Sequence, residues 1–167
     1  MIDTMTNLSE DMMFMTEDQI SDLASQQEQS TVETRKFLIF LTDDLRMGVD
    51  AEYVVEIITN HPITKLRLVP TYVRGIINLR GQIIPIVDTR ILLRCDGEDN
   101  QCIIILNIEG TLVGILIDSV MKMVDVDKES LRQDLAQKAQ NLVSGMCSLP
   151  DGQTMLVFDC AQILNQV

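Results

Sequence analysis

The side chains of this sequence that could act as nucleophiles or metal ligands are few and scattered. There are four cysteines and one histidine. No two cysteines form a C-x-x-C pair, and His61 stands beside Pro62 with no serine or cysteine motif nearby. A structural zinc site needs cysteine or histidine at short spacings, and nucleophilic catalysis needs a base held beside the nucleophile. The sequence therefore predicts no metal site, no cofactor and no catalytic centre built on these residues.

Three aspartates each follow an apolar segment: Asp88, Asp118 and Asp159. Each could act as an acid, but a carboxylate at a strand end more often accepts hydrogen bonds from backbone N–H groups of the next turn. Motifs of hydrolases, metalloproteases and nucleotide-binding proteins, such as G-x-S-x-G, H-E-x-x-H and G-x-G-x-x-G, are absent from the sequence. We therefore predict that the protein is not an enzyme. A small β-barrel enzyme or ligand sensor is the weaker alternative.

Three of the cysteines lie inside or beside apolar runs, namely Cys102, Cys147 and Cys160. A thiol in such a place behaves as a small hydrophobic group. We expect these three cysteines to be buried and to react slowly with thiol reagents. Cys95 adjoins a polar segment and is the expected exception.

One cation stands in a more suggestive position. Arg80 lies between two apolar runs, Ile76-Ile77 and 83–87, whose β-branched residues predict two strands joined by a tight hairpin. Gly81 supplies the positive φ of the turn. Pro85 has no N–H, so its strand either lies at a sheet edge or loses pairing at that residue. Arg80 could be a solvated turn residue, the partner of an internal carboxylate, or a contact to another protein.

The composition supports an aliphatic core and argues against nucleic-acid binding. Apolar residues make up 46% of the sequence, aromatic residues make up 4%, and tryptophan is absent. The net charge is −12, and residues 1–34 hold eight acids but no lysine or arginine. A nucleic-acid-binding protein needs basic side chains to replace phosphate counterions. We predict no nucleic-acid partner, and a mobile, disordered acidic leader over residues 1–34.

The sequence has no run of about 18 uncharged apolar residues, so we expect no transmembrane helix and no direct membrane insertion. The N-terminal residues lack the basic and apolar regions of a secretory signal. A cytoplasmic protein is therefore predicted.

Short strands are predicted over 36–41, 46–49, 63–68 and on both sides of Gly81, with a helical turn that begins at Asp50. Residues 128–141 are polar and contain neither glycine nor proline, so they are predicted as helix or loop. Many short strands separated by turns favour small β-barrels over a parallel α/β sheet.

The second half of the sequence resembles the first. Residues 145–164 share Gly, Leu, Gly-Gln and Asp with residues 75–92 once one residue is inserted in the turn. We therefore predict two repeated β units within one domain over 35–167, with approximate halves 35–95 and 101–167. Arg80 has no counterpart in the second copy, and this asymmetry favours a contact between Arg80 and another protein.

The central hairpin and its flanks carry the pattern Pro70-x-x-Val73-x-Gly75-x-x-Asn78-Leu79-Arg80-Gly81-x-x-x-Pro85-Ile86-Val87-Asp88. This pattern resembles the signature of the CheW family of bacterial chemotaxis coupling proteins. The similarity extends over about residues 35–165, and its other parts are Phe37-Leu38-x-Phe40, Val54-Val55-Glu56-Ile57, Leu106-Asn107, Val113-Gly114, Ile117-Asp118 and the segment 145–164.

The resemblance implies a mainly β fold of two five-stranded SH3-like barrels, packed around an apolar seam and accompanied by short helices. It implies a non-enzymatic adaptor that couples methyl-accepting chemotaxis receptors to the CheA histidine kinase. Its partners would be the regulatory domain of CheA and the cytoplasmic tip of the receptors, which would recruit it to membrane receptor arrays. A CheV-type module or another signalling scaffold is the alternative. The sequence ends at Val167 without a receiver or ATP-binding domain, so a stand-alone adaptor is expected.

The resemblance also implies a receptor groove between the two barrels. The candidate receptor or kinase contacts carried over to this sequence are Val54, Glu56, Gly75, Arg80, Cys102, Val120 and Met123. Cys102 and Met123 fall where the family usually has aliphatic β-branched residues. Val54 and Val120 could equally be core residues. Glu56 and Arg80 could instead pair with each other, because a charge is rarely buried without a partner, and such a pair would fix the angle between the barrels.

Overall fold

The structure is a computed structural model that describes residues 32–95, 101–133 and 142–167. The chain divides into two units, Met1–Glu33 and Thr34–Val167, and every strand and helix below belongs to the second unit. The predicted leader lies outside the described residues, apart from its last three positions. Residues 134–141 of the segment predicted as helix or loop also lie outside them.

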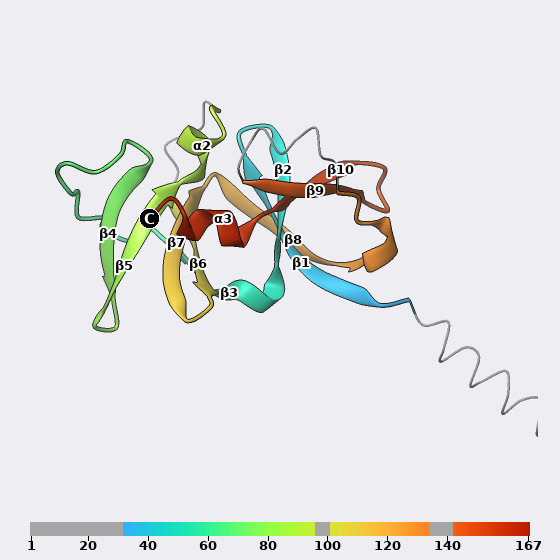
Figure 1. Cartoon of the computed structure of the whole chain (residues 1–167), viewed down its shortest axis with the longest axis horizontal. Coiled ribbons are helices and arrows are strands. Elements are labelled where there is room, and N and C mark those ends of the chain that lie inside the picture. The colour runs from blue at the N-terminus through green and yellow to red at the C-terminus, as the bar shows by residue number, and fades with distance from the viewer. Residues whose placement is uncertain (1–31, 96–100, 134–141) are drawn as a thin grey trace, which may run out of the picture. The chain divides into compact units, whose positions relative to one another are not determined.

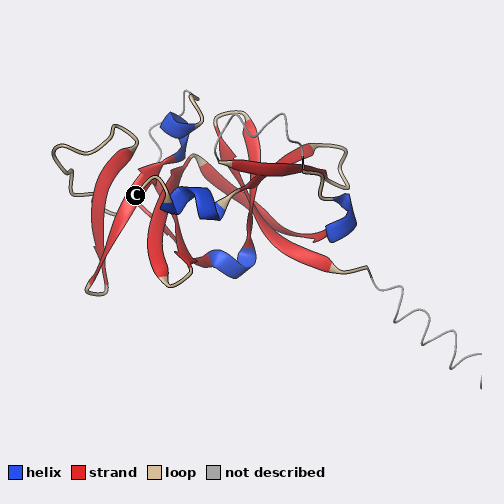
Figure 2. Cartoon of the chain, viewed as in Figure 1, coloured by secondary structure: helices blue, strands red, loops and turns tan. Residues whose placement is uncertain are grey.

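Within the described residues, ten strands form two five-stranded sheets, so the predicted mainly β fold is confirmed (Figure 2). The strands are β1 (Thr34–Thr42), β2 (Leu45–Asp50), β3 (Val54–Thr59), β4 (Val73–Leu79), β5 (Gln82–Asp88), β6 (Cys102–Ile108), β7 (Thr111–Ile117), β8 (Ser119–Asp127), β9 (Val143–Ser148) and β10 (Thr154–Phe158). Sheet A has the strand order β8-β1-β2-β10-β9, and sheet B has the order β3-β6-β7-β5-β4 (Figure 1).

Each sheet takes strands from both halves of the sequence. Sheet A joins β1 and β2 to β8, β9 and β10, and sheet B joins β6 and β7 to β3, β4 and β5. The two parallel pairings correspond to each other: β5 lies beside β7, and β10 lies beside β2. The repeat found in the sequence is therefore present, but the first two strands of each copy are exchanged between the sheets.

Four short helices connect the strands: η1 (Ala51–Tyr53), α2 (Thr89–Leu92), η2 (Lys128–Ser130) and α3 (Cys160–Leu164). An aspartate precedes each helix and accepts a hydrogen bond from the backbone N–H two residues later. These capping residues are Asp50, Asp88, Asp127 and Asp159. The predicted role of Asp88 and Asp159 as acceptors for turn N–H groups is confirmed, and so is the helical turn after Asp50.

The central hairpin forms as predicted from β4 and β5. Its two-residue turn, Arg80-Gly81, has φ values of 51° and 82°, and positive φ at both positions is the hairpin geometry that matches strand twist. The Asn78 side chain supports the turn by accepting from the Gly81 N–H at 2.9 Å. The β6–β7 hairpin has the same design, since Glu109 and Gly110 have φ values of 52° and 85°.

Two predictions near this hairpin need correction. The strand of Pro85 is not at a sheet edge, because β5 lies between β7 and β4. Pairing with β7 begins only at Ile86, so the predicted loss of pairing at Pro85 holds on that side, while on the other side Pro85 lies opposite Ile76 of β4. The predicted strand over 63–68 is wrong: only Thr64 pairs, in an isolated bridge to Ile76. The positive φ of Leu68, 61°, is incompatible with an extended chain there.

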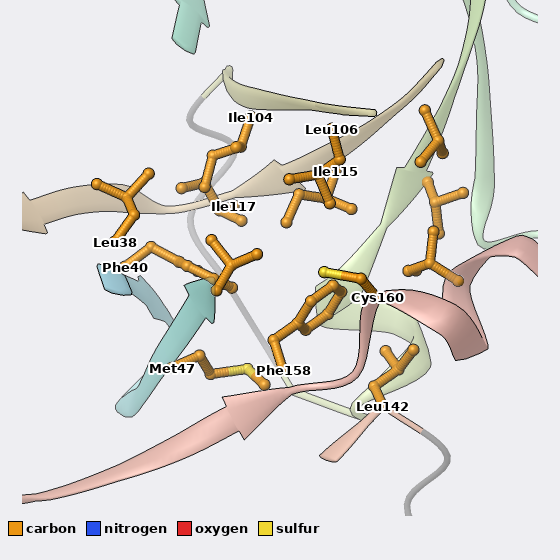
Figure 3. Close-up of a cluster of buried hydrophobic side chains, with 14 of the residues drawn as sticks. Leu38, Phe40, Met47, Ile104, Leu106, Ile115, Ile117, Leu142, Phe158 and Cys160 are labelled. Carbon is orange, nitrogen blue, oxygen red and sulfur yellow. The ribbon is translucent and has the colours of Figure 1, made fainter. Parts of the chain in front are cut away.

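The largest core cluster lies between the two sheets (Figure 3). Its members include Leu38, Phe40 and Met47 from sheet A and Ile104, Leu106, Ile115 and Ile117 from sheet B. Two smaller clusters lie within sheet A and sheet B respectively. As predicted, the core is mainly aliphatic. Cys102, Cys147 and Cys160 are buried within it and Cys95 is partly exposed, which confirms the burial predicted for the cysteines.

Candidate interaction groove

An open groove of about 490 Å³ lies where the two sheets meet. One wall is the end of β3, an edge strand of sheet B, and the other is the start of β8, an edge strand of sheet A. The lining residues are Ile57, Thr59, Asn60, Gln101, Cys102, Asp118, Ser119 and Val120. Two of the predicted contact residues, Cys102 and Val120, therefore line the groove.

The edge strand β3 carries one extra residue beside this groove. In its pairing with β6, Val54 lies opposite Leu106 and Glu56 lies opposite Ile105, so Val55 is bulged out of register. Val55 and Ile57 are about half exposed, whereas Val54 packs against the core between the sheets. Of the aliphatic residues on β3, the prediction selected Val54, but the exposed ones are Val55 and Ile57.

The edge strand β8 repeats this arrangement. Lys122 lies opposite Ile39 and Val120 lies opposite Phe40, which leaves Met121 as the extra residue. Bulges at sheet edges commonly re-aim side chains next to functional sites. Met121 and Met123 are 41% and 48% exposed, while Val120 packs against the core as well as lining the groove. The two bulged edge strands that contribute to the groove thus also expose aliphatic and methionine side chains, of which Ile57 lines the groove itself.

Arg80 forms a two-pronged ion pair with Glu56. The two guanidinium nitrogens donate to the two carboxylate oxygens at 2.6 and 3.1 Å. These hydrogen bonds and the charge of Glu56 raise the pKa of Arg80. The side chain of Arg80 is 75% exposed and that of Glu56 is 23% exposed. The pair is therefore internal, but most of the guanidinium is still accessible to a partner.

The idea that this pair fixes the angle between the two barrels is wrong. Glu56 lies on β3 and Arg80 follows β4, and both strands belong to sheet B. Since β3 and β4 are the two edges of that sheet, the pair instead joins edge to edge, as closure of a barrel requires. Glu56 lies between Val55 and Ile57 on β3. This strand therefore carries both Ile57, which lines the groove, and the acidic partner of Arg80.

Gly75 has a structural role that explains its place in the pattern. It is buried, its φ is 144°, and an added Cβ would lie 2.1 Å from the carbonyl oxygen of Thr64. Gly145 in β9 is its counterpart, because a Cβ there would lie 2.5 Å from the carbonyl oxygen of Arg132. At both places the segment before the hairpin bridges onto the strand that bears the glycine.

The buried thiols are unsuited to nucleophilic chemistry. Burial raises the pKa of Cys102, which lies in the groove. Burial, together with the charges of Asp159 and Asp50, raises the pKa of Cys160 to about 12. Nowhere in the described parts of the chain do three or more histidine, cysteine or acidic side chains gather as a metal site would require. Among the described residues there is also no helix of sufficient length and hydropathy to span a membrane.

Comparison with known proteins gives consistent matches. A family model described as a CheW-like domain matches residues 36–167. The chemotaxis protein CheW of Klebsiella aerogenes is 30% identical over 137 residues, which are 78% of this chain and 82% of that protein. The chemotaxis protein CheW of Thermotoga maritima is 26% identical over 137 residues, or 78% of this chain and 87% of that protein. The crystal structure of the scaffolding protein TtCheW from Thermoanaerobacter tengcongensis has a TM-score of 0.67 and 26% identity, and the match covers 76% of this chain and 90% of that one.

Proposed function

The chain belongs to the CheW-like domain family of chemotaxis scaffolds, and from this premise we propose that it couples methyl-accepting chemotaxis receptors to the CheA histidine kinase. In this role it is a non-enzymatic, cytoplasmic adaptor that joins receptor arrays through its partners. It binds the cytoplasmic tip of the receptor and the regulatory domain of the kinase.

The observation that carries this proposal is the groove between the sheets with its exposed apolar rim. Val55, Ile57, Met121 and Met123 are each 41–50% exposed on β3 and β8, the two edge strands that contribute residues to the groove, and Ile57 lines it. Large exposed apolar side chains gathered on the edges of a groove are typical of protein–protein contact sites. Methionine side chains are flexible and polarizable, so they adapt well to a partner. We assign the receptor tip to this groove.

The exposed face of Arg80 supports a second contact. Its guanidinium is fixed by Glu56 but mostly open to solvent, so it can also donate to a carboxylate of a partner. Held in one orientation, an arginine loses less conformational freedom on binding than a free one. Arg80 therefore serves the coupling of the two partners, while its pair with Glu56 positions it.

The experiment that tests this function replaces Ile57 with serine. Ile57→Ser removes an apolar side chain from the groove wall. We expect affinity for a receptor cytoplasmic fragment to fall by about tenfold, as for loss of a moderate interface contact, while affinity for the CheA regulatory domain stays unchanged. Both affinities are measured by calorimetry.

The control is Ile91→Ser in α2. Ile91 is 39% exposed and Ile57 is 42% exposed, so the two changes remove the same side chain from similarly exposed places, but Ile91 is not among the residues that line the groove. Equal receptor affinities for the two variants would contradict the assignment of the groove. Absence of any binding of the unchanged protein to receptor or kinase would contradict the function itself.

A further inference from the structure

Asp118 occupies the point where the chain passes from one sheet to the other. Strand β7 of sheet B ends at Ile117, and β8 of sheet A begins at Ser119. One residue therefore makes the whole connection. Asp118 also lines the groove, so it belongs both to the junction of the sheets and to the candidate binding surface.

The carboxylate of Asp118 is held from both sheets. On the side of sheet B, its Oδ1 accepts from Nη1 of Arg90 at 3.3 Å. On the side of sheet A, its Oδ2 accepts from the backbone N–H of Asp43 in the β1–β2 turn. The backbone N–H of Asp118 adds a third contact by donating to the carbonyl oxygen of Leu41 at 3.0 Å. The side chain is only 14% exposed.

Arg90 is a rigid anchor for this carboxylate. Its side chain is 5% exposed and donates to Asp88 through Nε at 3.1 Å and Nη2 at 3.3 Å. Asp88 is also buried and accepts from Nη1 of Arg74 at 3.2 Å. Two arginines and two aspartates thus balance in charge. Apart from Arg74, which is 37% exposed, these side chains are at most 14% exposed, so an arrangement of the elements that separated them would leave charges without partners in a poorly solvated place.

We propose that Asp118 is a positioning residue that clamps sheet A to sheet B at the floor of the groove and so fixes the separation of its walls. The consequence for receptor binding rests on the proposed function. The clamp presents β3 and β8 at one spacing before a partner arrives, and a preformed groove loses less conformational freedom on binding.

Cys102 provides a direct measure of this clamp, because its thiol lies in the groove and is almost buried. Although the groove is open to solvent, the residue is only 9% exposed, so a thiol reagent reaches its sulfur only when the groove walls move apart. The measurement uses the full chain with Cys95→Ser, which removes the partly exposed cysteine. Adding Asp118→Asn keeps the size of the side chain but removes its charge. We expect labelling of Cys102 to become at least tenfold faster.

Two control variants distinguish the loss of the Asp118 contacts from a general loss of protein stability. Asp151→Asn removes the carboxylate that pairs with Arg46 of β2 from the β9–β10 turn, without removing any hydrogen bond of Asp118, and should leave labelling unchanged. Ile104→Val removes one methylene group from the core between the sheets and lowers stability without touching the clamp. Labelling in Asp118→Asn must exceed that in Ile104→Val. Should Asp118→Asn not fold, Asp118→Glu replaces it, because a longer carboxylate cannot keep both contacts at the same wall separation.

If Cys102 is labelled no faster in the Asp118 variant than in Ile104→Val, the proposal that Asp118 fixes the separation of the groove walls is wrong. A receptor fragment gives the second readout: its affinity should fall in Asp118→Asn while affinity for the CheA regulatory domain is retained. If the receptor fragment fails to bind even the unchanged protein, the proposed function is wrong, but the labelling rates still decide whether Asp118 holds the groove.

Discussion

Arg80 combines a mostly exposed cation with a strained backbone. Its φ of 51° lies in the region that glycine, asparagine and aspartate tolerate best. An asparagine in this place would make a better turn, so the turn alone does not explain the arginine. The structure gives the guanidinium a use, because it pairs with Glu56 and presents its outer face to solvent.

Arg80→Asn removes the charge of Arg80 but keeps a residue that suits the turn, so it tests the two roles of this position separately. We expect the melting temperature to stay the same or rise slightly, because asparagine followed by glycine suits the turn and exposed ion pairs contribute little to stability. We expect receptor-stimulated kinase activity, reconstituted from purified components, to fall severalfold. Glu109→Asn is the matched control, since Glu109 occupies the equivalent turn between β6 and β7. Full stimulation by a folded Arg80→Asn protein would rule out a signalling role for the arginine.

At the scale of single residues, the sequence identified residue types better than their orientation. It singled out Arg80 from its place in a turn, and it named Glu56 as a possible internal partner. It selected Val54, which the family resemblance supplied, rather than Val55, which is bulged out of register with β6 and half exposed. Such a bulge depends on pairing with β6, which lies far along the sequence, so no local pattern reveals it.

Two edge strands, β4 and β9, are each bridged at one residue by the chain segment that precedes them. Thr64 pairs with Ile76 and Arg132 pairs with Met146. An edge strand exposes unpaired backbone groups that invite association with other chains, and a bridge satisfies some of them. The adjoining glycines allow the close approach that these bridges need.

Gly75→Ala should therefore act on stability rather than on recognition. The positive φ and the clash with the Thr64 carbonyl together should lower the free energy of unfolding by about 3 kcal/mol or more. Gly110→Ala, in an open turn with a φ of 85°, should lower it by only about 1–2 kcal/mol. Urea unfolding followed by circular dichroism measures both. A fully stable Gly75→Ala protein with weakened receptor binding would instead restore Gly75 as a contact residue.

Elements with strong local signals were predicted correctly. The β4–β5 hairpin follows from its apolar runs and its Arg-Gly turn, and the helical turn after Asp50 follows from a capping aspartate. The strand predicted over 63–68 was wrong, although Lys65, Leu66, Arg67 and Leu68 alternate as a strand would. Alternation shows only that a segment could be a strand, and here the segment meets β4 at Thr64 alone before the chain turns away with a positive φ at Leu68.

For the whole molecule, the exchange of strands makes the two halves of the domain interdependent. Sheet A needs β8 to β10 beside β1 and β2, and sheet B needs β6 and β7 beside β3. The repeat itself was visible in the sequence, but the exchange was not. Its parallel pairings, β5 with β7 and β2 with β10, join distant segments, and hydrophobic patterns do not name the partner of a strand.

Fragments 32–95 and 101–167 test this interdependence. Each fragment alone should lack a cooperative thermal transition, because the core residues between the sheets would have lost the partners that the other fragment supplies. An equimolar mixture should regain the β-sheet circular dichroism spectrum and a single transition. A fragment that unfolds cooperatively by itself would contradict the prediction, and the intact chain serves as the reference.

The same exchange has a consequence for synthesis on the ribosome. The β1–β2 hairpin emerges early, but β2 receives its second neighbour only when β10 (Thr154–Phe158) has been made. At about 5–20 residues per second, roughly a hundred intervening residues take about 5–20 s to translate. Until then Leu38, Phe40, Met47 and Val49 lack the part of their core cluster that Phe158, Cys160 and Ile163 supply. The nascent chain therefore carries an apolar hairpin with an incomplete core and an unpaired strand edge for seconds, and during this period chaperone binding competes with aggregation.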